Sequence, residues 1–212
     1  MTDESHPNGR VGKRQAILEA ALRVFAREGY GQASVDTIAS EAGVSKATIY
    51  NHLGDKETLF RHALAEIASR SNTKTMDALG AFPTHPEDLR AGLLGVAHKL
   101  AECFADDQST ALRRLLQSEI VRFPDLFETI RDSGPNQATE ALAGQLARLA
   151  NAGYLELADP LRAANQFVAL IVDELPTLSA LGTRKIDDAD LTKAVAAGVD
   201  TFLRAFGNRA TL

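Results

Sequence analysis

The chain contains few of the residues that identify several common protein classes. Its 212 residues include no tryptophan, two methionines and a single cysteine, Cys103. One cysteine cannot form an intrachain disulfide, which excludes a disulfide-stapled fold and fits the reducing cytoplasm. The longest apolar run, Phe167 to Val172, is far shorter than the ~20 residues of a membrane-spanning helix. Residues 1–9 are polar, so we expect a disordered leader there and no secretory signal.

An excess of positive charge is also absent. The net charge is −5, and residues 1–61 contain eight lysines and arginines against eight aspartates and glutamates. A nucleic-acid footprint on this part of the chain would therefore require the fold to cluster its cations. Arg10 and Lys13 lie just before the first expected helix, and Arg14 begins it. They form either a flexible basic arm that reaches a nucleic-acid backbone or a solvated leader.

Strand-like alternation of apolar and polar residues is missing, whereas apolar residues recur at helical spacing. Capping residues, glycines and prolines divide this pattern into helices. We expect an all-α chain with helices at residues 14–30, 35–42, 46–53, 56–79, 86–105, 109–122, 124–132, 136–152, 160–181 and 187–206. Pro176 should kink the helix at 160–181.

The most specific local pattern is segment 34–60, which predicts two short helices, a tight turn between them and the start of a third helix. Ser34 and Ser45 are suited to cap the two short helices and Asp55 the third, because such side chains accept hydrogen bonds from the first amides of a helix. Gly43 can adopt the left-handed conformation that ends the first short helix. The expected inward face of that helix is Val35, Ile38, Ala39 and Ala42. This arrangement is typical of a helix-turn-helix DNA reader.

On a helical wheel, Ile49 and Leu53 of the second short helix face the core. The opposite face is small and polar and would fit a major groove. There, Ala47 is placed to contact a thymine methyl group and Asn51 to pair with an adenine edge. We predict phosphate contacts from Thr48, Tyr50, His52 and Lys56. The full predicted DNA-binding set is Ser34, Ser45, Lys46, Ala47, Thr48, Tyr50, Asn51, His52 and Lys56.

Three stretches carry a family resemblance. AGVSKATIYNHL at 42–53, DKE at 55–57 and the first expected helix, RQAILEAALRVFAREGY at 14–30, resemble the N-terminal domain of TetR/AcrR transcriptional regulators. Two positions depart from the usual pattern of that family. Asn51 stands where an aromatic residue or arginine is frequent, which affects the expected operator, and Leu53 replaces the usual phenylalanine of the core. The resemblance implies a DNA-binding transcriptional repressor.

The rest of the chain carries a second resemblance. SEIVRFPDL at 118–126, Gly134–Pro135 and GYLELADPLRAANQF at 153–167 resemble the C-terminal domain of AefR-like TetR regulators. This resemblance implies a helical regulatory domain that dimerises and binds a small molecule. The expected domains are a disordered leader at 1–9, a helix-turn-helix DNA-binding domain at 10–60, and a regulatory ligand-binding and dimerisation domain at 61–212.

The last two long helices have apolar residues on more than one face. These residues are Ala163, Ala164, Phe167, Val168, Leu170, Ile171 and Val172, then Leu191, Ala194, Val195, Ala197, Gly198, Val199, Phe202 and Leu203. An uncovered apolar face of this size is typical of an interface, so we predict a homodimer with a four-helix bundle across a two-fold axis. The small residues Ala194 and Gly198 would let helices approach closely. Complete burial within one subunit is the alternative.

A small-molecule pocket is expected in the regulatory domain. Its predicted lining is Phe104, Leu116, Ile120, Phe123, Phe127, Phe167 and Ile171. Such a lining suits an apolar or amphipathic effector, and ordinary core packing is the alternative for each residue. The family resemblance implies that effector binding pivots the helix at 56–79 and changes the spacing of the two DNA-reading heads of a dimer.

Other chemistry is weakly marked. The pairs His98–Glu102 and His62–Glu66 have the spacing of metal ligands but lack a second contributing element, so surface pairs are favoured. Cys103 is a candidate redox sensor if Lys99 lowers the pKa of its thiol, and a buried structural cysteine is the alternative. We expect no catalytic residue, no metal site and no cofactor.

The sequence is therefore compatible with two functions. The first is a ligand-responsive repressor that binds a pseudo-palindromic double-stranded DNA operator as a dimer. The second is a helical small-molecule sensor or adaptor that keeps the fold without operator binding. The segment 34–60 taken by itself has a further alternative to a DNA reader. It could be an ordinary helical hairpin in which the small residues only permit packing.

Overall fold

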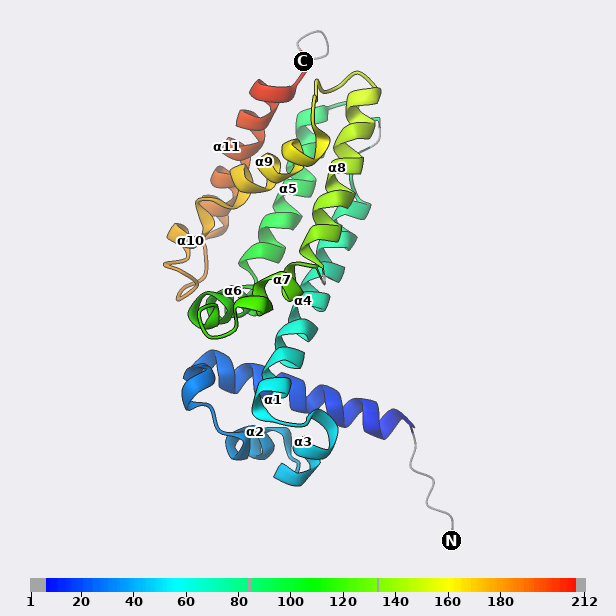
Figure 1. The fold of residues 1–212 in the computed structure, drawn as a ribbon. Coiled ribbons are helices and arrows are strands. Elements are labelled where there is room, and N and C mark those ends of the chain that lie inside the picture. The colour runs from blue at the N-terminus through cyan, green and yellow to red at the C-terminus, as the bar shows by residue number, and fades with distance from the viewer. Residues whose placement is uncertain (1–6, 84, 133, 209–212) are drawn as a thin grey trace. The chain divides into compact units, whose positions relative to one another are not determined.

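The computed structural model describes residues 7–83, 85–132 and 134–208, and it confirms the predicted all-α fold (Figure 1). The helices are α1 (Pro7–Gln32), α2 (Val35–Ala42), α3 (Lys46–Leu53), α4 (Lys56–Gly80), α5 (Leu89–Ala105), α6 (Asp107–Glu119), α7 (Pro124–Asp132), α8 (Pro135–Asn151), α9 (Pro160–Val172), α10 (Leu175–Leu178) and α11 (Asp188–Phe206). Across these described ranges, β-type pairing is limited to an isolated antiparallel bridge between Leu155 and Gly207. No described helix combines the length and the apolar character needed to cross a membrane.

The chain divides into two compact units. The first unit comprises the chain up to residue 69 together with 111–130, and the second comprises 70–110 together with the chain from residue 131 onward. Each unit has its own hydrophobic core. Helices α4, α6 and α7 contribute residues to both units, whereas α2 and α3 belong wholly to the first.

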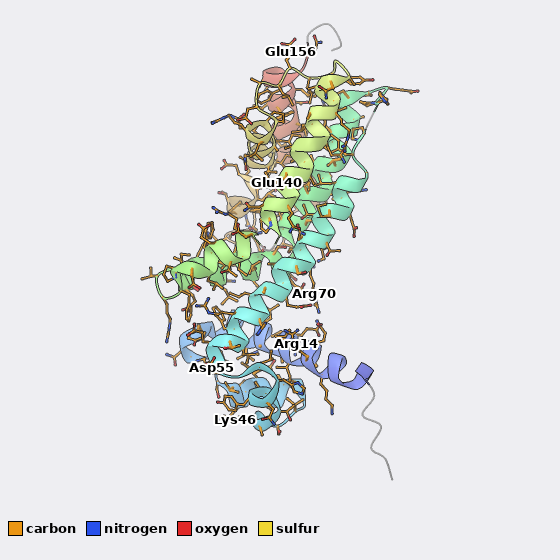
Figure 2. The ribbon with its side chains drawn as sticks, turned by 45° about the vertical axis from the view of Figure 1, so that its right-hand side comes forward. Arg14, Lys46, Asp55, Arg70, Glu140 and Glu156 are labelled. Carbon is orange, nitrogen blue, oxygen red and sulfur yellow. The ribbon has the colours of Figure 1, made fainter. Side chains whose placement is uncertain are left out.

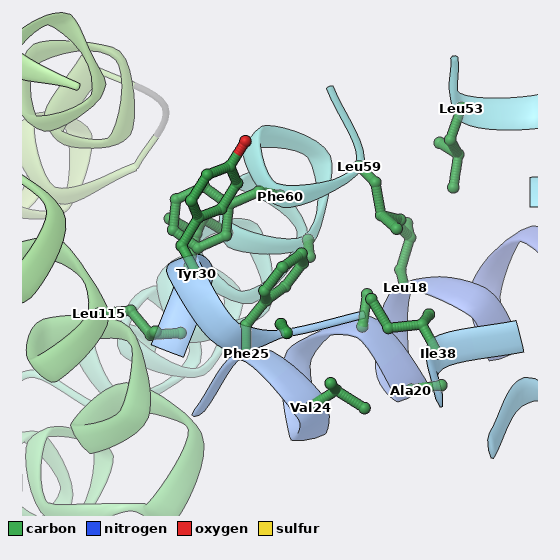
Figure 3. Packing of buried hydrophobic residues seen from close by; sticks show 14 of the residues in the cluster. Leu18, Ala20, Val24, Phe25, Tyr30, Ile38, Leu53, Leu59, Phe60 and Leu115 are labelled. Carbon is green, nitrogen blue, oxygen red and sulfur yellow. The ribbon is translucent and has the colours of Figure 1, made fainter. Parts of the chain in front are cut away.

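The core of the first unit contains a cluster of aromatic rings. Phe25, Tyr30 and Phe60 gather there, as Figure 3 shows. The Phe25 and Phe60 rings meet edge to face with their centroids 4.9 Å apart, and Tyr30 lies 4.9 Å from Phe60. Phe123, from the segment before α7, closes the cluster at 5.0 Å from Tyr30. Aromatic pairs in this geometry contribute beyond the area that they bury.

Helix α1 begins earlier than the sequence predicted. Arg10, Lys13 and Arg14 lie within it, so the first of the two interpretations, a flexible arm, is wrong for these residues. Of the predicted disordered leader, residues 1–6 lie outside the described residues, and Pro7–Gly9 form the first turn of α1. The basic residues are therefore carried on a helix whose position is fixed by the buried face of α1.

The second unit is built from α5, α8, α9 and α11, which pack against one another around an apolar core. Phe167 and Phe202 meet edge to face at its centre with their centroids 4.9 Å apart. Helix α11 approaches α9 closely at Gly198, where a Cβ atom would lie 2.9 Å from the carbonyl carbon of Leu170 and 3.2 Å from the amide nitrogen of Ile171. Only a residue without a side chain permits this approach.

This packing corrects one part of the predicted interface. The close approach that the sequence assigned to helices of two subunits is made at Gly198 inside one chain. Most of the apolar residues named for the dimer face are likewise buried within the second unit. They are Ala163, Ala164, Phe167, Ile171, Ala194, Val195, Gly198, Val199, Phe202 and Leu203.

Three predicted helices also need corrected boundaries. The helix predicted at 109–122 is α6, which spans Asp107–Glu119. Helix α5 begins at Leu89, later than predicted, because Asp88 caps it by accepting a hydrogen bond from the amide of Ala91 at 2.9 Å. The helix predicted at 160–181 ends at Val172, and Pro176 belongs to the separate short helix α10. Proline therefore accompanies a break in this segment where we expected a kink.

Candidate nucleic-acid interface

Helices α2 and α3 and their connecting turn have the geometry that the sequence predicts. The hydroxyl of Ser34 accepts a hydrogen bond from the amide of Asp36, and that of Ser45 accepts one from the amide of Thr48, each at 3.1 Å. Gly43 ends α2 in the left-handed conformation, with φ 66° and ψ 32°. Two capped helix starts and one glycine turn thus fix α3 relative to α2.

The start of α4 is capped in the same way. The carboxylate of Asp55 accepts a hydrogen bond from the amide of Thr58 at 2.7 Å. This bond to a backbone amide lowers the pKa of Asp55 below its ordinary value. Figure 2 places Asp55 and Lys46 on the first unit, at the starts of α4 and α3 respectively.

Helix α3 presents a small polar face to solvent. Ile49 and Leu53 are buried in the core, as predicted from the helical wheel. On the other side Ala47 and Asn51 are exposed, and Tyr50 is 44 % exposed. Within the described part of the chain the Asn51 amide has no hydrogen-bond partner, which leaves its donor and acceptor available to a base edge.

Several other residues of the predicted DNA-binding set have partners within the chain. The Lys46 ammonium donates to the Asp36 carboxylate at 2.8 Å, and this bond raises the pKa of Lys46. The hydroxyl oxygens of Ser45 and Thr48 lie 2.8 Å apart. The hydroxyl of Ser34 is occupied by its capping bond. His52 is half-buried at the edge of α3. These residues therefore support the shape of the helix pair as well as offering groups to DNA.

The Lys56 side chain packs against the end of α1. Its ammonium lies 4.7 Å from the centroid of the Tyr30 ring and donates to the carbonyl of Gly31 at 3.3 Å. The guanidinium of Arg122 lies 4.6 Å from the same ring. Tyr30 is 7 % exposed, and its burial raises the pKa of its hydroxyl, so the ring is neutral beneath the two cations. Lys56 therefore has a fixed position from which to meet a phosphate.

Ion pairs within the first unit use many of the cations that could form a phosphate footprint. The paired cations are Arg23 and Arg27 with Glu41, Lys46 with Asp36, and Arg61 with Glu57 and Asp125. Arg14 instead contacts the Nδ1 atom of His62 at 3.4 Å. Among the described residues, Lys13 and Lys56 have no carboxylate partner. Part of the available positive charge therefore lies at the start of α1 and the start of α4, and Arg122 adds to it beside Lys56.

The seven residues predicted to line a pocket divide between the two units. Phe123 is buried in the first core, and Leu116 packs against it. Ile120 and Phe127 belong to the same unit, where Ile120 is half-buried and Phe127 is 47 % exposed. In the second unit Phe167 and Ile171 are fully buried and Phe104 packs against their core. The structure therefore does not bring the seven together within one unit, and their role in ligand binding stays a prediction.

The predicted sensor chemistry is not supported at Cys103. Burial raises the pKa of its thiol, with the Asp106 carboxylate acting in the same direction, whereas the sequence suggested that Lys99 would lower it. A raised pKa leaves less thiolate, which is the reactive form. Among the residues described, no group of three or more histidine, cysteine, aspartate or glutamate side chains is placed to hold a metal ion.

Sequence reasoning missed two contributors to this surface. Asp36 pairs with Lys46 across two helices, and no rule of local helical spacing connects those positions. The Tyr30 ring lies beneath the Lys56 ammonium. The glycines on either side of Tyr30 could have indicated from the sequence that the chain turns there. Gly29 has φ 74° and ψ 162°, which interrupts α1 and turns Tyr30 into the core.

Two family models match the chain. The model described as bacterial regulatory proteins, tetR family, matches residues 17–63, which include α2 and α3. The model described as AefR-like transcriptional repressor, C-terminal domain, matches residues 91–208, which is more than half of the chain. Both matches agree with the two resemblances inferred from the sequence.

Two proteins of similar sequence are transcriptional repressors. The nicotine-responsive transcriptional repressor HdnoR of Paenarthrobacter nicotinovorans is 36% identical over 114 residues, which is 52% of this chain and 53% of that protein. The transcriptional repressor AcnR of Corynebacterium efficiens is 45% identical over 60 residues, covering 28% of this chain and 32% of that protein. The matched region thus spans about half the length of the first relative and about a third of the second.

Solved structures resemble nearly the whole chain. A TetR-family transcriptional regulator from Mesorhizobium loti MAFF303099 superimposes with a TM-score of 0.83 at 28% identity, covering 93% of this chain and 98% of that chain. The flavonoid-responsive regulator FrrA superimposes with a TM-score of 0.67 at 32% identity over the same shares. Together with the two family models, these similarities show that the chain belongs to the TetR family of bacterial regulatory proteins.

Proposed function

We propose that the protein is a ligand-responsive transcriptional repressor that binds a pseudo-palindromic DNA operator as a dimer and is released by a small molecule. The observation that carries this proposal is the exposed face of α3, where Ala47, Tyr50 and Asn51 stand on a helix held by the Ser45 cap and the Gly43 turn. A small polar face on a fixed helix suits a major groove, in which base edges are distinguishable.

The contacts have separate roles in this proposal. Asn51 pairs with an adenine edge and Ala47 meets a thymine methyl group, so these two residues read sequence. Lys56 contacts the backbone from its seat on Tyr30, and Lys13 adds charge at the start of α1. Thr48, Tyr50 and His52 complete the phosphate contacts. Because many other cations of this unit are already paired, we expect few phosphate contacts per subunit and a moderate salt dependence.

Dimerisation through α9 and α11 is proposed on a smaller surface than the sequence suggested. The apolar residues that remain exposed or half-buried on these helices are Leu161, Val168, Ala169, Leu170, Val172, Ala189, Leu191, Ala196, Ala197, Ala205 and Phe206. Such residues would be covered by the same surface of a second copy in a two-fold interface. A dimer would carry two copies of α3 to half-sites about one helical turn of DNA apart, or a multiple of that distance.

A small organic effector is the proposed release signal. The names of two similar proteins describe them as nicotine-responsive and flavonoid-responsive. In this chain Phe104, Phe167 and Ile171 of the second unit are the candidate apolar lining. An effector that weakens DNA binding 100-fold must supply about 2.7 kcal/mol of coupling between its site and the DNA site. Nicotine and a flavonoid are therefore the first compounds to test against the DNA complex.

The test of the proposed function is a selection of random double-stranded DNA on the purified protein at about 0.15 M salt, where non-specific binding is weak. An enriched pseudo-palindrome with a fixed half-site spacing would support a dimeric operator reader and supply the probe for effector screening. No enrichment from a folded dimer at any salt concentration, with effector removed, would favour the alternative of a small-molecule sensor that keeps the fold without operator binding.

Two variants separate base reading from phosphate binding on the selected operator. Asn51→Ala should cost about 1–3 kcal/mol at one base pair and relax the preference there. Lys56→Ala should weaken binding to all sequences and reduce the salt slope by about one. Equal losses on operator and scrambled DNA for Asn51→Ala would remove its proposed role in base reading.

A further inference from the structure

Asp36 and Lys46 form a contact that the helix-turn-helix motif does not require. Asp36 lies in the first turn of α2 and Lys46 is the first residue of α3, and their charged atoms are 2.8 Å apart. Their side chains remain 68% and 46% exposed, respectively. Ion pairs as exposed as this one contribute little to stability, typically ~0–1 kcal/mol. The contribution of this ion pair to the stability of the fold is therefore too small to explain its presence.

The location of the pair has a stronger consequence for DNA binding. Lys46 stands at the start of the helix that offers Ala47 and Asn51 to a base edge. A free lysine there would add its charge to the positive end of the α3 dipole, which attracts phosphate of any sequence. The Asp36 carboxylate neutralises that charge and holds the lysine in one position.

We propose that Asp36 is a specificity-determining residue, which lowers sequence-independent DNA affinity by holding Lys46 across the α2–α3 pair. This inference rests on the proposed function. When held, Lys46 meets a phosphate or base edge only in the register of the operator. Once released, it samples several rotamers and pairs with any phosphate within reach. Removing Asp36 should therefore strengthen binding to scrambled DNA more than binding to the operator.

The experiment compares operator and scrambled duplexes over a range of salt concentrations, using the full chain. Asp36→Asn keeps the size of the side chain and removes its charge. We expect its affinity for scrambled DNA to rise about threefold to tenfold near 0.1 M salt, with a salt slope steeper by about 0.9, because one more cation becomes available to phosphate. Operator affinity should change less than scrambled affinity, so the ratio between them should fall.

Glu41→Gln is the matched control. Glu41 lies on the same helix, and its ion pairs among the described residues are with Arg23 and Arg27 of α1. The control removes one negative charge from the same unit and releases cations of α1 in place of the cation on α3, so it measures the effect of charge that does not act through Lys46. If Glu41→Gln and Asp36→Asn lower the operator-to-scrambled ratio equally, charge explains the result and the role of Asp36 in specificity is wrong.

Lys46→Gln in the Asp36→Asn background tests whether the gain in affinity for scrambled DNA comes from the released Lys46. We expect this double variant to lose the gain on scrambled DNA, because the cation responsible has been removed. Persistence of the gain, or an equal rise on operator and scrambled DNA, would overturn the inference. Wild-type protein is measured first: if it shows no sequence preference, the proposed function fails, and if it discriminates while Asp36→Asn leaves the ratio unchanged, only this inference fails. Circular dichroism confirms that each variant is folded.

Discussion

The two units fix their helices by different means. In the first unit, α2 and α3 are eight residues each, and each begins at a serine side chain that accepts a hydrogen bond from a backbone amide. In the second unit, α8, α9 and α11 contain 17, 13 and 19 residues and are joined by a largely aliphatic core. Caps occur there too, at Asp159 and Asp187, but most of the burial lies along the helix faces.

Helix length explains the difference. An isolated helix of eight residues is unstable in water, because nucleation costs more than so few hydrogen bonds return. Short helices must therefore be specified residue by residue, through caps and turns that a sequence displays directly. Longer helices can rely on packing between distant segments, which a sequence displays only as a pattern of apolar residues.

The largest expected effect is the loss of the aromatic cluster of the first unit. Phe60 is fully buried and lies against the rings of Phe25, Tyr30 and Phe123. Phe60→Ala should lower the free energy of unfolding by about 3–5 kcal/mol, measured by urea denaturation. Phe127→Ala is the control, because Phe127 is 47 % exposed, and it should cost less than about 1 kcal/mol. Similar losses for the two variants would contradict the assigned core.

The next largest effect is expected from replacing glycine by alanine at two helical positions of the second unit. At Gly198 a Cβ atom would press on the backbone of Leu170, so Gly198→Ala should cost about 1–3 kcal/mol through overpacking. At Gly144 of α8 a Cβ atom would meet nothing within 4 Å. Gly144→Ala should therefore stabilise the protein by about 0.5–1 kcal/mol, because alanine favours the helix. Thermal unfolding of both variants checks the contrast, and a Gly198→Ala variant as stable as the wild type or more stable would show that α9 and α11 are not in this close contact.

Gly198 also shows how much of the packing could be predicted from the sequence. The reduced size at positions 194 and 198 was recognised from sequence, but the choice between a neighbour in the same chain and one in a partner depends on three-dimensional packing. In the first unit, by contrast, Ser34, Gly43 and Ser45 were assigned their structural roles correctly, because each role depends on neighbours within five residues. The Asp36–Lys46 pair was missed for the converse reason, since it joins two helices.

A smaller effect tests whether local specification matters in the first unit. Ser45→Ala removes the acceptor for the amide of Thr48, and it should cost about 1 kcal/mol in the free energy of unfolding. Operator affinity should fall as well, since α3 would fray at its first turn. Ser40→Ala is the matched control on α2, because Ser40 is exposed and its hydroxyl has no partner among the described residues. An unchanged stability for Ser45→Ala would mean that packing of Ile49 and Leu53 is sufficient to hold α3.

The smallest effect is a dependence on pH at the start of α4. The amide of Thr58 lowers the pKa of Asp55 in the folded protein below its unfolded value of about 3.9. The unfolded chain therefore binds the proton first as the pH falls. The stabilisation from this cap should be complete above about pH 5 and should be lost as the pH falls through the folded pKa.

Asp55→Asn isolates this contribution from other carboxylates. Asparagine is also a good cap but carries no titratable charge, so the variant keeps an acceptor for the Thr58 amide at every pH. The stability of the wild type relative to the variant should fall between about pH 5 and pH 3, as measured by urea denaturation at each pH. A constant difference across that range would show that the Asp55 carboxylate does not stabilise α4 through its charge. The Asp55 cap would then act through its hydrogen-bond geometry alone, as the uncharged caps at Ser34 and Ser45 do.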